Sequence, residues 1–179
     1  MRLRRLQEKD APGMLEWMQD KDIQKCFRFS TQEKTLNDVL RFIEVSDVLW
    51  EHKADVHYAA VDDNDEYLGT VSLKEIDMVN RKCEFAISLR KCAQGKGVGT
   101  WCVKEALRIA FDDYNLEKVY LNVLAENVTA TKLYEKCGFV FEGEFRNDLF
   151  LRGSFKSLKW FSILKDEYYG GNNHENNAK

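Results

Sequence analysis

The sequence contains little of what marks metal-binding, disulfide-stapled or membrane-spanning proteins. Its 179 residues include a single proline and three histidines, and its five cysteines form no Cys-x-x-Cys pair. No apolar run approaches the roughly 18 residues of a membrane span, and polar residues follow the basic N-terminus where a signal peptide has an apolar core. We therefore expect a cytoplasmic chain with reduced cysteines, no metal site and no membrane partner.

An excess of charge of one sign is also absent. Lysine and arginine number 27 and aspartate and glutamate 30, so the formal net charge is −3. Because nucleic-acid affinity depends on a broad basic surface, we expect no nucleic-acid partner. Hydrophobic residues make up 44 % and aromatics 12 %, which is typical of a folded chain. We expect one domain over residues 1–168, followed by a disordered polar tail at 169–179.

The hydrophobic pattern alternates between the period of a strand and the period of a helix. It predicts helices from Asp10 through Met18, over 36–50, over 98–114 and from Asn127 to Gly138. Strands are predicted over 2–6, 56–61, 67–76, 83–90, 118–124, 139–150 and 155–164. This order predicts an α/β (α+β) fold.

Glycine is sparse except at one place, where Gly95, Gly97 and Gly99 lie between a predicted strand and the strongest predicted helix. A glycine-rich loop before a helix N-terminus offers free N–H groups and the positive end of the helix dipole to a phosphate. The spacing fits neither a P-loop nor a dinucleotide-binding fingerprint. A turn that merely ends the strand remains an alternative, as does another phosphate-ligand site.

Two motifs in this order resemble the GNAT superfamily of N-acetyltransferases. Gln94, Gly97 and Gly99 match that family's acetyl-CoA pyrophosphate loop, and the segment from Asn127 to Phe139 matches its N-x-x-A-x-x-L-Y-E-K-x-G-F helix motif. The branch that the sequence resembles contains the ribosomal-protein alanine and spermidine N-acetyltransferases.

The resemblance implies a mixed, mostly antiparallel central sheet with helices on both faces and a V-shaped split between the fourth and fifth strands. It also implies that acetyl-CoA is the donor. The residues expected to bind it are Ile87, Ser88, Leu89, Gln94, Gly95, Lys96, Gly97, Val98, Gly99, Thr100, Asn127 and Lys136.

Two residues match the family's catalytic positions. Glu84 matches a base that acts through water, and an ion pair on a half-exposed strand is the alternative. Tyr134 matches the general acid near the CoA sulfur, and a packed helical aromatic is the alternative. We expect His57, on an alternating strand, to be structural rather than catalytic.

The acceptor is less determined than the donor. The resemblance implies direct attack by a primary amine, and a polyamine, a protein N-terminus and an amino sugar all remain open. Spermidine enzymes of this branch carry an acidic run after the first helix, but this sequence has Cys26-Phe27-Arg28-Phe29-Ser30 there. A non-catalytic acyl-CoA-binding module is the alternative function, and a homodimer is among the expected assemblies.

Overall fold

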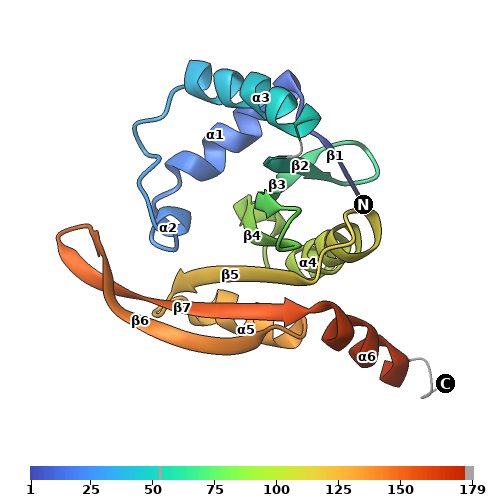
Figure 1. Ribbon diagram of the computed structural model, residues 1–179. Helices are drawn as coiled ribbons and strands as arrows, with labels where there is room; N and C mark the ends of the chain where they lie inside the picture. The colour runs from blue at the N-terminus through green and yellow to red at the C-terminus, as the bar shows by residue number, and fades with distance from the viewer. Residues whose placement is uncertain (53, 176–179) are drawn as a thin grey trace.

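A seven-stranded sheet runs through the protein in the order β1-β2-β3-β4-β5-β7-β6 (Figure 1). The structure is a computed structural model that describes residues 1–52 and 54–175. All neighbouring strands are antiparallel except β4 and β5, which are parallel. The strands are β1 (Arg2–Arg5), β2 (Val56–Val61), β3 (Tyr67–Asp77), β4 (Lys82–Leu89), β5 (Lys118–Leu124), β6 (Val140–Leu151) and β7 (Ser154–Leu164).

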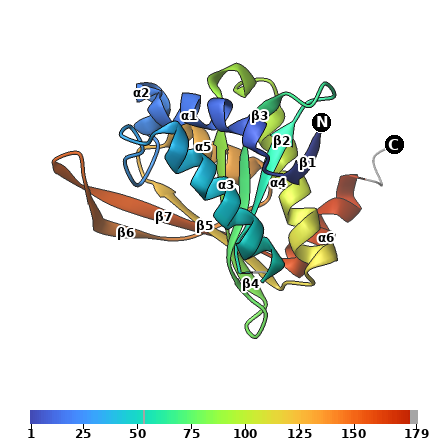
Figure 2. The same cartoon turned by 90° about the horizontal axis from the view of Figure 1, so that it is seen from above.

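Helices cover both faces of the sheet (Figures 1 and 2). Helices α1 (Ala11–Gln19) and α3 (Leu36–Glu51) lie on one face, with α2 (Lys21–Gln24) between them in the chain. On the opposite face lie α4 (Val98–Arg108) and α5 (Val128–Lys136), and α6 (Lys165–Glu175) follows β7. This arrangement confirms the fold class expected from the sequence, including the mostly antiparallel sheet.

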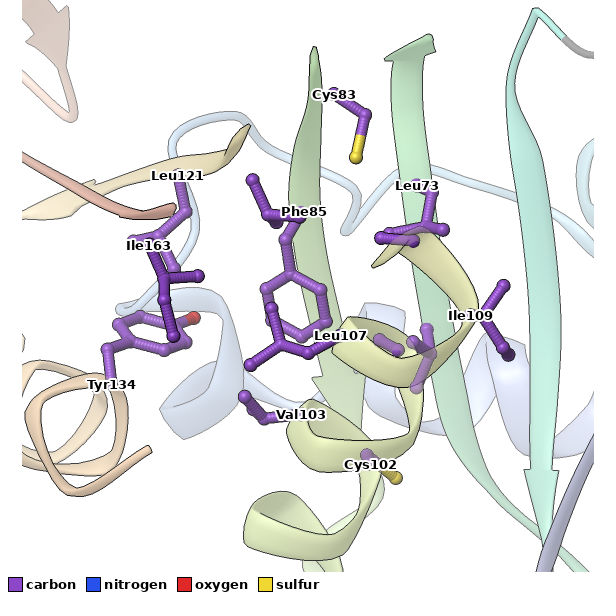
Figure 3. Close-up of a cluster of buried hydrophobic side chains, with 14 of the residues drawn as sticks. Leu73, Cys83, Phe85, Cys102, Val103, Leu107, Ile109, Leu121, Tyr134 and Ile163 are labelled. Carbon is purple, nitrogen blue, oxygen red and sulfur yellow. The ribbon is translucent and has the colours of Figure 1, made fainter. Parts of the chain in front are cut away.

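Each face has its own buried apolar cluster, because successive side chains of a strand point to opposite faces. On β2, Ala59 and Val61 pack with α1 and α3, whereas Tyr58 and Ala60 belong to the larger cluster. Phe85 of β4 lies in that larger cluster together with side chains of α4 (Figure 3). Apolar packing therefore holds the sheet on both faces. It also determines to which face each side chain of β4 points.

The parallel pair β4–β5 separates soon after it forms. Only Lys82, Cys83 and Glu84 of β4 have partners on β5, and the last pair joins Glu84 to Tyr120. Beyond this pair β4 stays bonded to β3, up to Leu89, and β5 stays bonded to β7, up to Leu124. The expected split between the fourth and fifth strands is thus confirmed.

Strands β6 and β7 extend past the rest of the sheet as a long hairpin, which we call the arm (Figure 2). At its tip, Arg152 donates hydrogen bonds to the backbone carbonyls of Gln24, Lys25 and Phe27. Phe27 also stacks on Trp17 of α1, with ring centroids 5.2 Å apart. The segment between α2 and α3 is therefore held by both the arm and α1.

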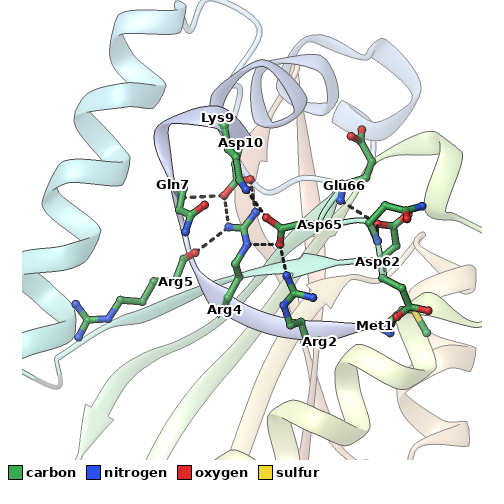
Figure 4. A network of polar contacts seen from close by, with 12 residues as sticks. Met1, Arg2, Arg4, Arg5, Gln7, Lys9, Asp10, Asp62, Asp65 and Glu66 are labelled. Atoms are coloured by element: carbon green, nitrogen blue, oxygen red, sulfur yellow. Dashed lines mark hydrogen bonds and ion pairs between the residues drawn. The ribbon is translucent and has the colours of Figure 1, made fainter.

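A polar network fixes the N-terminal strand (Figure 4). Arg4 donates to both carboxylate oxygens of buried Asp10, at 2.7 and 2.8 Å, and to Asp65 at 2.8 Å. Lys9 and Arg2 also pair with Asp65. Because a bidentate arginine–carboxylate pair has a defined geometry, this network fixes where α1 begins relative to β1.

The structure adds elements that the hydrophobic pattern does not predict. Helix α2 is four residues long, and the helix predicted over 98–114 ends in a turn of π-helix, Ile109–Asp113. Helix α6 occupies part of the segment 169–179 for which we expected disorder, and Glu167 accepts a hydrogen bond from the backbone N–H of Leu164 at its start. Residues 176–179, which complete that expected tail, lie outside the described part of the chain.

Candidate active site

A cavity of about 790 Å³ passes through the sheet where β4 and β5 separate. Its walls come from both faces of the sheet. On one face it is lined by residues of the glycine loop, α4 and α5, and on the other by residues of α1, α3 and the segment between α2 and α3. Two ligands can therefore enter from opposite sides and meet at the split.

The glycine loop forms the first part of the donor side. Gly97 is the N-cap residue of α4, with φ +80°, and no side chain caps this helix. Gln94 donates a hydrogen bond of 3.1 Å to the carbonyl of Leu89, which ties the loop to the end of β4. The first N–H groups of α4 thus face the cavity without a side-chain cap, as an anion site requires.

Helix α5 forms the second part of the donor side. The Oδ1 atom of Asn127 accepts a hydrogen bond of 3.1 Å from the N–H of Ala130, so Asn127 is the N-cap residue of α5, at the start that the sequence predicts. Asn127, Ala130, Leu133, Tyr134 and Lys136 all line the cavity.

Tyr134 lies almost completely buried at the split. Its ring packs edge-on against Phe85 and also against Phe139, and its hydroxyl points toward β4 (Figure 3). Burial raises the pKa of Tyr134 well above its usual value, and the nearby charge of Arg28 opposes this only in part. A phenol in this environment keeps its proton at neutral pH and is available as a hydrogen-bond and proton donor at the split.

Glu84 is buried on the opposite side of the split and is held by two cations. Arg28 donates to Oε1 at 2.8 Å, and the ammonium of Lys74 lies 3.2 Å from Oε2. Both carboxylate oxygens are therefore engaged. The sequence left two interpretations of Glu84 open, a base that acts through water and a member of an ion pair, and the structure shows the ion pair.

Small and polar side chains form the floor of the cavity on the α1 and α3 face of the sheet. Ser72 pairs with Ala86 across β3 and β4, and the Oγ atom of Ser72 lies 2.8 Å from Nδ1 of His57. Burial lowers the pKa of His57, so the ring is neutral at pH 7. The cavity above this floor is walled by the apolar side chains of Met14, Trp17, Met18, Phe27, Phe29, Val39 and Phe42.

The structure brings ten of the twelve residues expected to bind acetyl-CoA to the cavity wall. The other two differ: the side chain of Val98 is buried in the core, and Lys96 is exposed and does not line the cavity. Trp50, near the end of α3, does not line the cavity and packs against Tyr58, with ring centroids 4.7 Å apart.

The sequence interpretation missed several cavity residues. Asn122 and Val123 of β5 line the cavity, as do Thr70 and Ser72 of β3. No local motif marks them, because they reach the cavity through strand register and the separation of β4 from β5. Alternation along β5 places Asn122 on the same face as Tyr120, but the pairing of β5 with β4 is needed to relate that face to Glu84.

Two further properties concern ions and membranes. Within the described residues, no group of three or more His, Cys, Asp or Glu side chains could hold a metal ion. In the same part of the chain, no helix combines the length and apolar character needed to cross a bilayer.

Comparisons with known proteins agree with this geometry. Residues 1–140 match the acetyltransferase (GNAT) domain. The chain is 35 % identical over 130 residues to a spermidine N(1)-acetyltransferase of Vibrio cholerae, which covers 71 % of this chain and 75 % of that protein. It is 32 % identical over 102 residues to YdaF of Bacillus subtilis, named as a proposed ribosomal N-acetyltransferase, covering 57 % of this chain and 56 % of YdaF.

A solved structure supports the same relationship. The crystal structure of spermidine N-acetyltransferase from Vibrio cholerae in complex with CoA and spermine has a TM-score of 0.84 to this chain at 28 % identity, covering 94 % of this chain and 97 % of that one. The family, the donor and the activity expected from the sequence are confirmed. The chain therefore belongs to the GNAT acetyltransferase family and is an acetyl-CoA-dependent N-acetyltransferase.

Proposed function

We propose that the enzyme acetylates a small polyamine of the spermidine class by direct attack of its primary amine on acetyl-CoA. The observation that carries this proposal is the single cavity through the sheet, which is open to a donor on one face and to an acceptor on the other. Because both ligands can be present together, a ternary complex needs no acetylated enzyme intermediate.

On the donor side, the uncapped N-terminus of α4 would bind the pyrophosphate of acetyl-CoA. The β4 backbone at Ile87, Ser88 and Leu89 has no partner on β5 and would hydrogen-bond the pantetheine arm and the thioester carbonyl. Tyr134 would then donate its proton to the departing CoA thiolate, and the phenolate would recover a proton from the water that has taken one from the amine. Its buried, protonated hydroxyl at the split supports this role.

Glu84 has a different task in this proposal from that of a free base. Its oxygens are engaged by Arg28 and Lys74, so a proton would leave the amine through water near this ion pair rather than directly onto the carboxylate. An ammonium of the acceptor could replace one of the two cations. After such an exchange the carboxylate would pair with the cationic acceptor at the split.

Two observations support a polyamine as the acceptor. The relatives that share 35 to 36 % identity are named spermidine N(1)-acetyltransferases, and a similar structure contains spermine. The acceptor side of the cavity offers apolar walls for methylene groups, and Asp38 is among its lining residues. The buried carboxylate of Glu84 lies behind this wall, paired with the lining residues Arg28 and Lys74.

The test is thiol release from acetyl-CoA with a panel of amines: spermidine, spermine, an alanine-terminated peptide and an amino-sugar nucleotide. We expect spermidine or spermine to give the highest kcat/KM, and initial-velocity plots to intersect as a ternary complex requires. A higher kcat/KM for the peptide or the sugar would contradict the polyamine assignment, and parallel plots would contradict direct attack. If acetyl-CoA stabilises the protein but no amine of the panel is acetylated, the result would favour the alternative function, a non-catalytic acyl-CoA-binding module.

The arm supports a proposal about assembly, namely a homodimer. Four of its phenylalanines, Phe141, Phe145, Phe150 and Phe155, are 51 to 63 % exposed. The free edge of β6 carries both Glu144 and Arg146, and a two-fold contact centred on Phe145 would place opposite charges together. Sedimentation should show a dimer that Phe145→Glu converts to a monomer. A wild-type monomer at micromolar concentration would contradict the proposal.

A further inference from the structure

The side-chain oxygen of Asn122 is buried without a hydrogen-bond partner. Among the described residues, only three buried side-chain polar atoms lack a partner, and they are Asn122 Oδ1, Thr131 Oγ1 and Trp160 Nε1. Asn122 alone of these three residues lines the cavity. Since native proteins rarely leave a buried carbonyl oxygen unpaired, this position calls for a partner that the chain does not supply.

The register of the sheet places Asn122 at the split. Glu84 and Tyr120 form the last pair between β4 and β5, and two residues further along lie Ala86 on β4 and Asn122 on β5. Alternation puts Asn122 on the same face of the sheet as Tyr120 and therefore as Glu84. The methyl side chain of Ala86 leaves space opposite the amide, on the side of the cavity from which the acceptor enters.

The carboxylate of Glu84, the other side-chain acceptor considered at the split, is already engaged. Both oxygens of Glu84 contact cations, Arg28 on one and Lys74 on the other. An amine that reaches the split needs at least one acceptor for its N–H groups while its lone pair points at the thioester carbon. Asn122 Oδ1 is an acceptor at the split that no protein donor occupies.

We infer that Asn122 binds the acceptor amine: its side-chain carbonyl accepts a hydrogen bond from the attacking nitrogen and orients it toward the acetyl group. This inference rests on the proposed function, because it assigns a residue to the acceptor of that reaction. It predicts that the amide acts on acceptor binding and leaves acetyl-CoA binding alone.

A structural role for the amide is the competing explanation. Trp160 is the cross-strand neighbour of Asn122, and its indole N–H also lacks a partner. The two groups form no hydrogen bond with each other, and the indole ring is fixed by packing against Tyr120 and Phe145, with centroids 6.2 and 5.4 Å away. A variant of each residue separates the two explanations.

The experiment compares Asn122→Leu, which removes the acceptor at similar volume, with Asn122→Asp, which keeps an oxygen. Spermidine is the varied substrate at saturating acetyl-CoA, and acetyl-CoA binding is measured separately by calorimetry. We expect the leucine variant to raise the KM for spermidine at least 10-fold, with its acetyl-CoA Kd within 2-fold of wild type and its Tm not lowered. The aspartate variant should stay within about 3-fold of the wild-type KM.

Two control variants complete the design. Thr131→Val removes another buried unpaired atom outside the cavity, and Trp160→Phe removes the indole N–H, so both should leave the KM for spermidine unchanged. An unchanged KM in Asn122→Leu, or an equal rise in Trp160→Phe, overturns the assignment of Asn122 while the proposed function stands. Wild-type protein that acetylates no amine of the panel overturns both.

Discussion

The guanidinium of Arg28 and the carboxylate of Glu84 are 2.8 Å apart, although 56 positions separate the two residues in the chain. Arg28 comes from the segment between α2 and α3, whose backbone carbonyls accept hydrogen bonds from Arg152 of the arm. Glu84 is the last residue of β4 that pairs with β5. The ion pair thus joins the acceptor wall to the split, at the place where a cationic substrate would arrive.

Replacing Arg28 by glutamine should strengthen the binding of a polyamine. The change removes a positive charge from the acceptor path and frees Oε1 of Glu84, while Lys74 still balances the buried carboxylate. We expect the KM for spermidine to fall about 3-fold or more in low salt, with a smaller effect at high ionic strength. A rise in KM would instead indicate that Arg28 contacts the acceptor itself.

Replacing Tyr134 by phenylalanine should slow the reaction without weakening donor binding. The ring packing against Phe85 and Phe139 is kept, so the variant should fold, and only the proton donor is lost. General-acid groups of this kind typically contribute on the order of 100-fold or more to kcat. Steady-state kinetics should show that loss in kcat, with an acetyl-CoA Kd close to wild type. An equal loss of kcat and of acetyl-CoA affinity would instead indicate that Tyr134 has a packing role.

Replacing Gly97 by alanine should lower both stability and acetyl-CoA affinity. Its φ of +80° is a left-handed conformation that costs a residue with a Cβ about 1 kcal/mol or more. Gly153 at the tip of the arm has nearly the same φ, +78°, and open space around it, so Gly153→Ala controls for backbone strain. The Tm of thermal unfolding should fall in both variants, whereas calorimetry should show weaker acetyl-CoA binding in Gly97→Ala alone.

His57 should make the protein less stable in mild acid. Burial lowers its folded-state pKa below the unfolded value near 6.5, so the unfolded chain binds the proton first as the pH falls. Its contribution to stability is therefore present above about pH 6.5 and is lost between that value and the lower folded pKa. His57→Gln should show a smaller drop in Tm between pH 7 and pH 5 than wild type. An identical drop would mean that other groups control this pH range.

Local patterns predicted most of the fold. The strand Val56–Val61 and the strand Lys118–Leu124 agree with their predicted bounds, because period-two alternation is strong in both. Helix α2 was missed because a helix of four residues has too few turns to show a period. The end of α5 was also predicted, because Gly138 follows the C-cap residue Cys137 and takes a positive φ of +92°.

The donor side of the site was also more predictable than the acceptor side. Gln94, Gly97 and Asn127 belong to contiguous motifs whose backbone geometry is local. The ion pair of Glu84 with Arg28 and the position of Asn122 depend on contacts between distant segments and on where β5 leaves β4. No pattern within one segment contains that information.

The short β4–β5 join has a consequence for the lifetime of the protein in a cell. Three residue pairs connect the half-sheet β1–β4 to the half-sheet β5–β7–β6, and bound acetyl-CoA would lie in the seam between them. A ligand that binds only the folded form stabilises it in proportion to the logarithm of its concentration. We therefore expect the metabolic supply of acetyl-CoA to set how often the seam opens and how quickly proteases remove the enzyme.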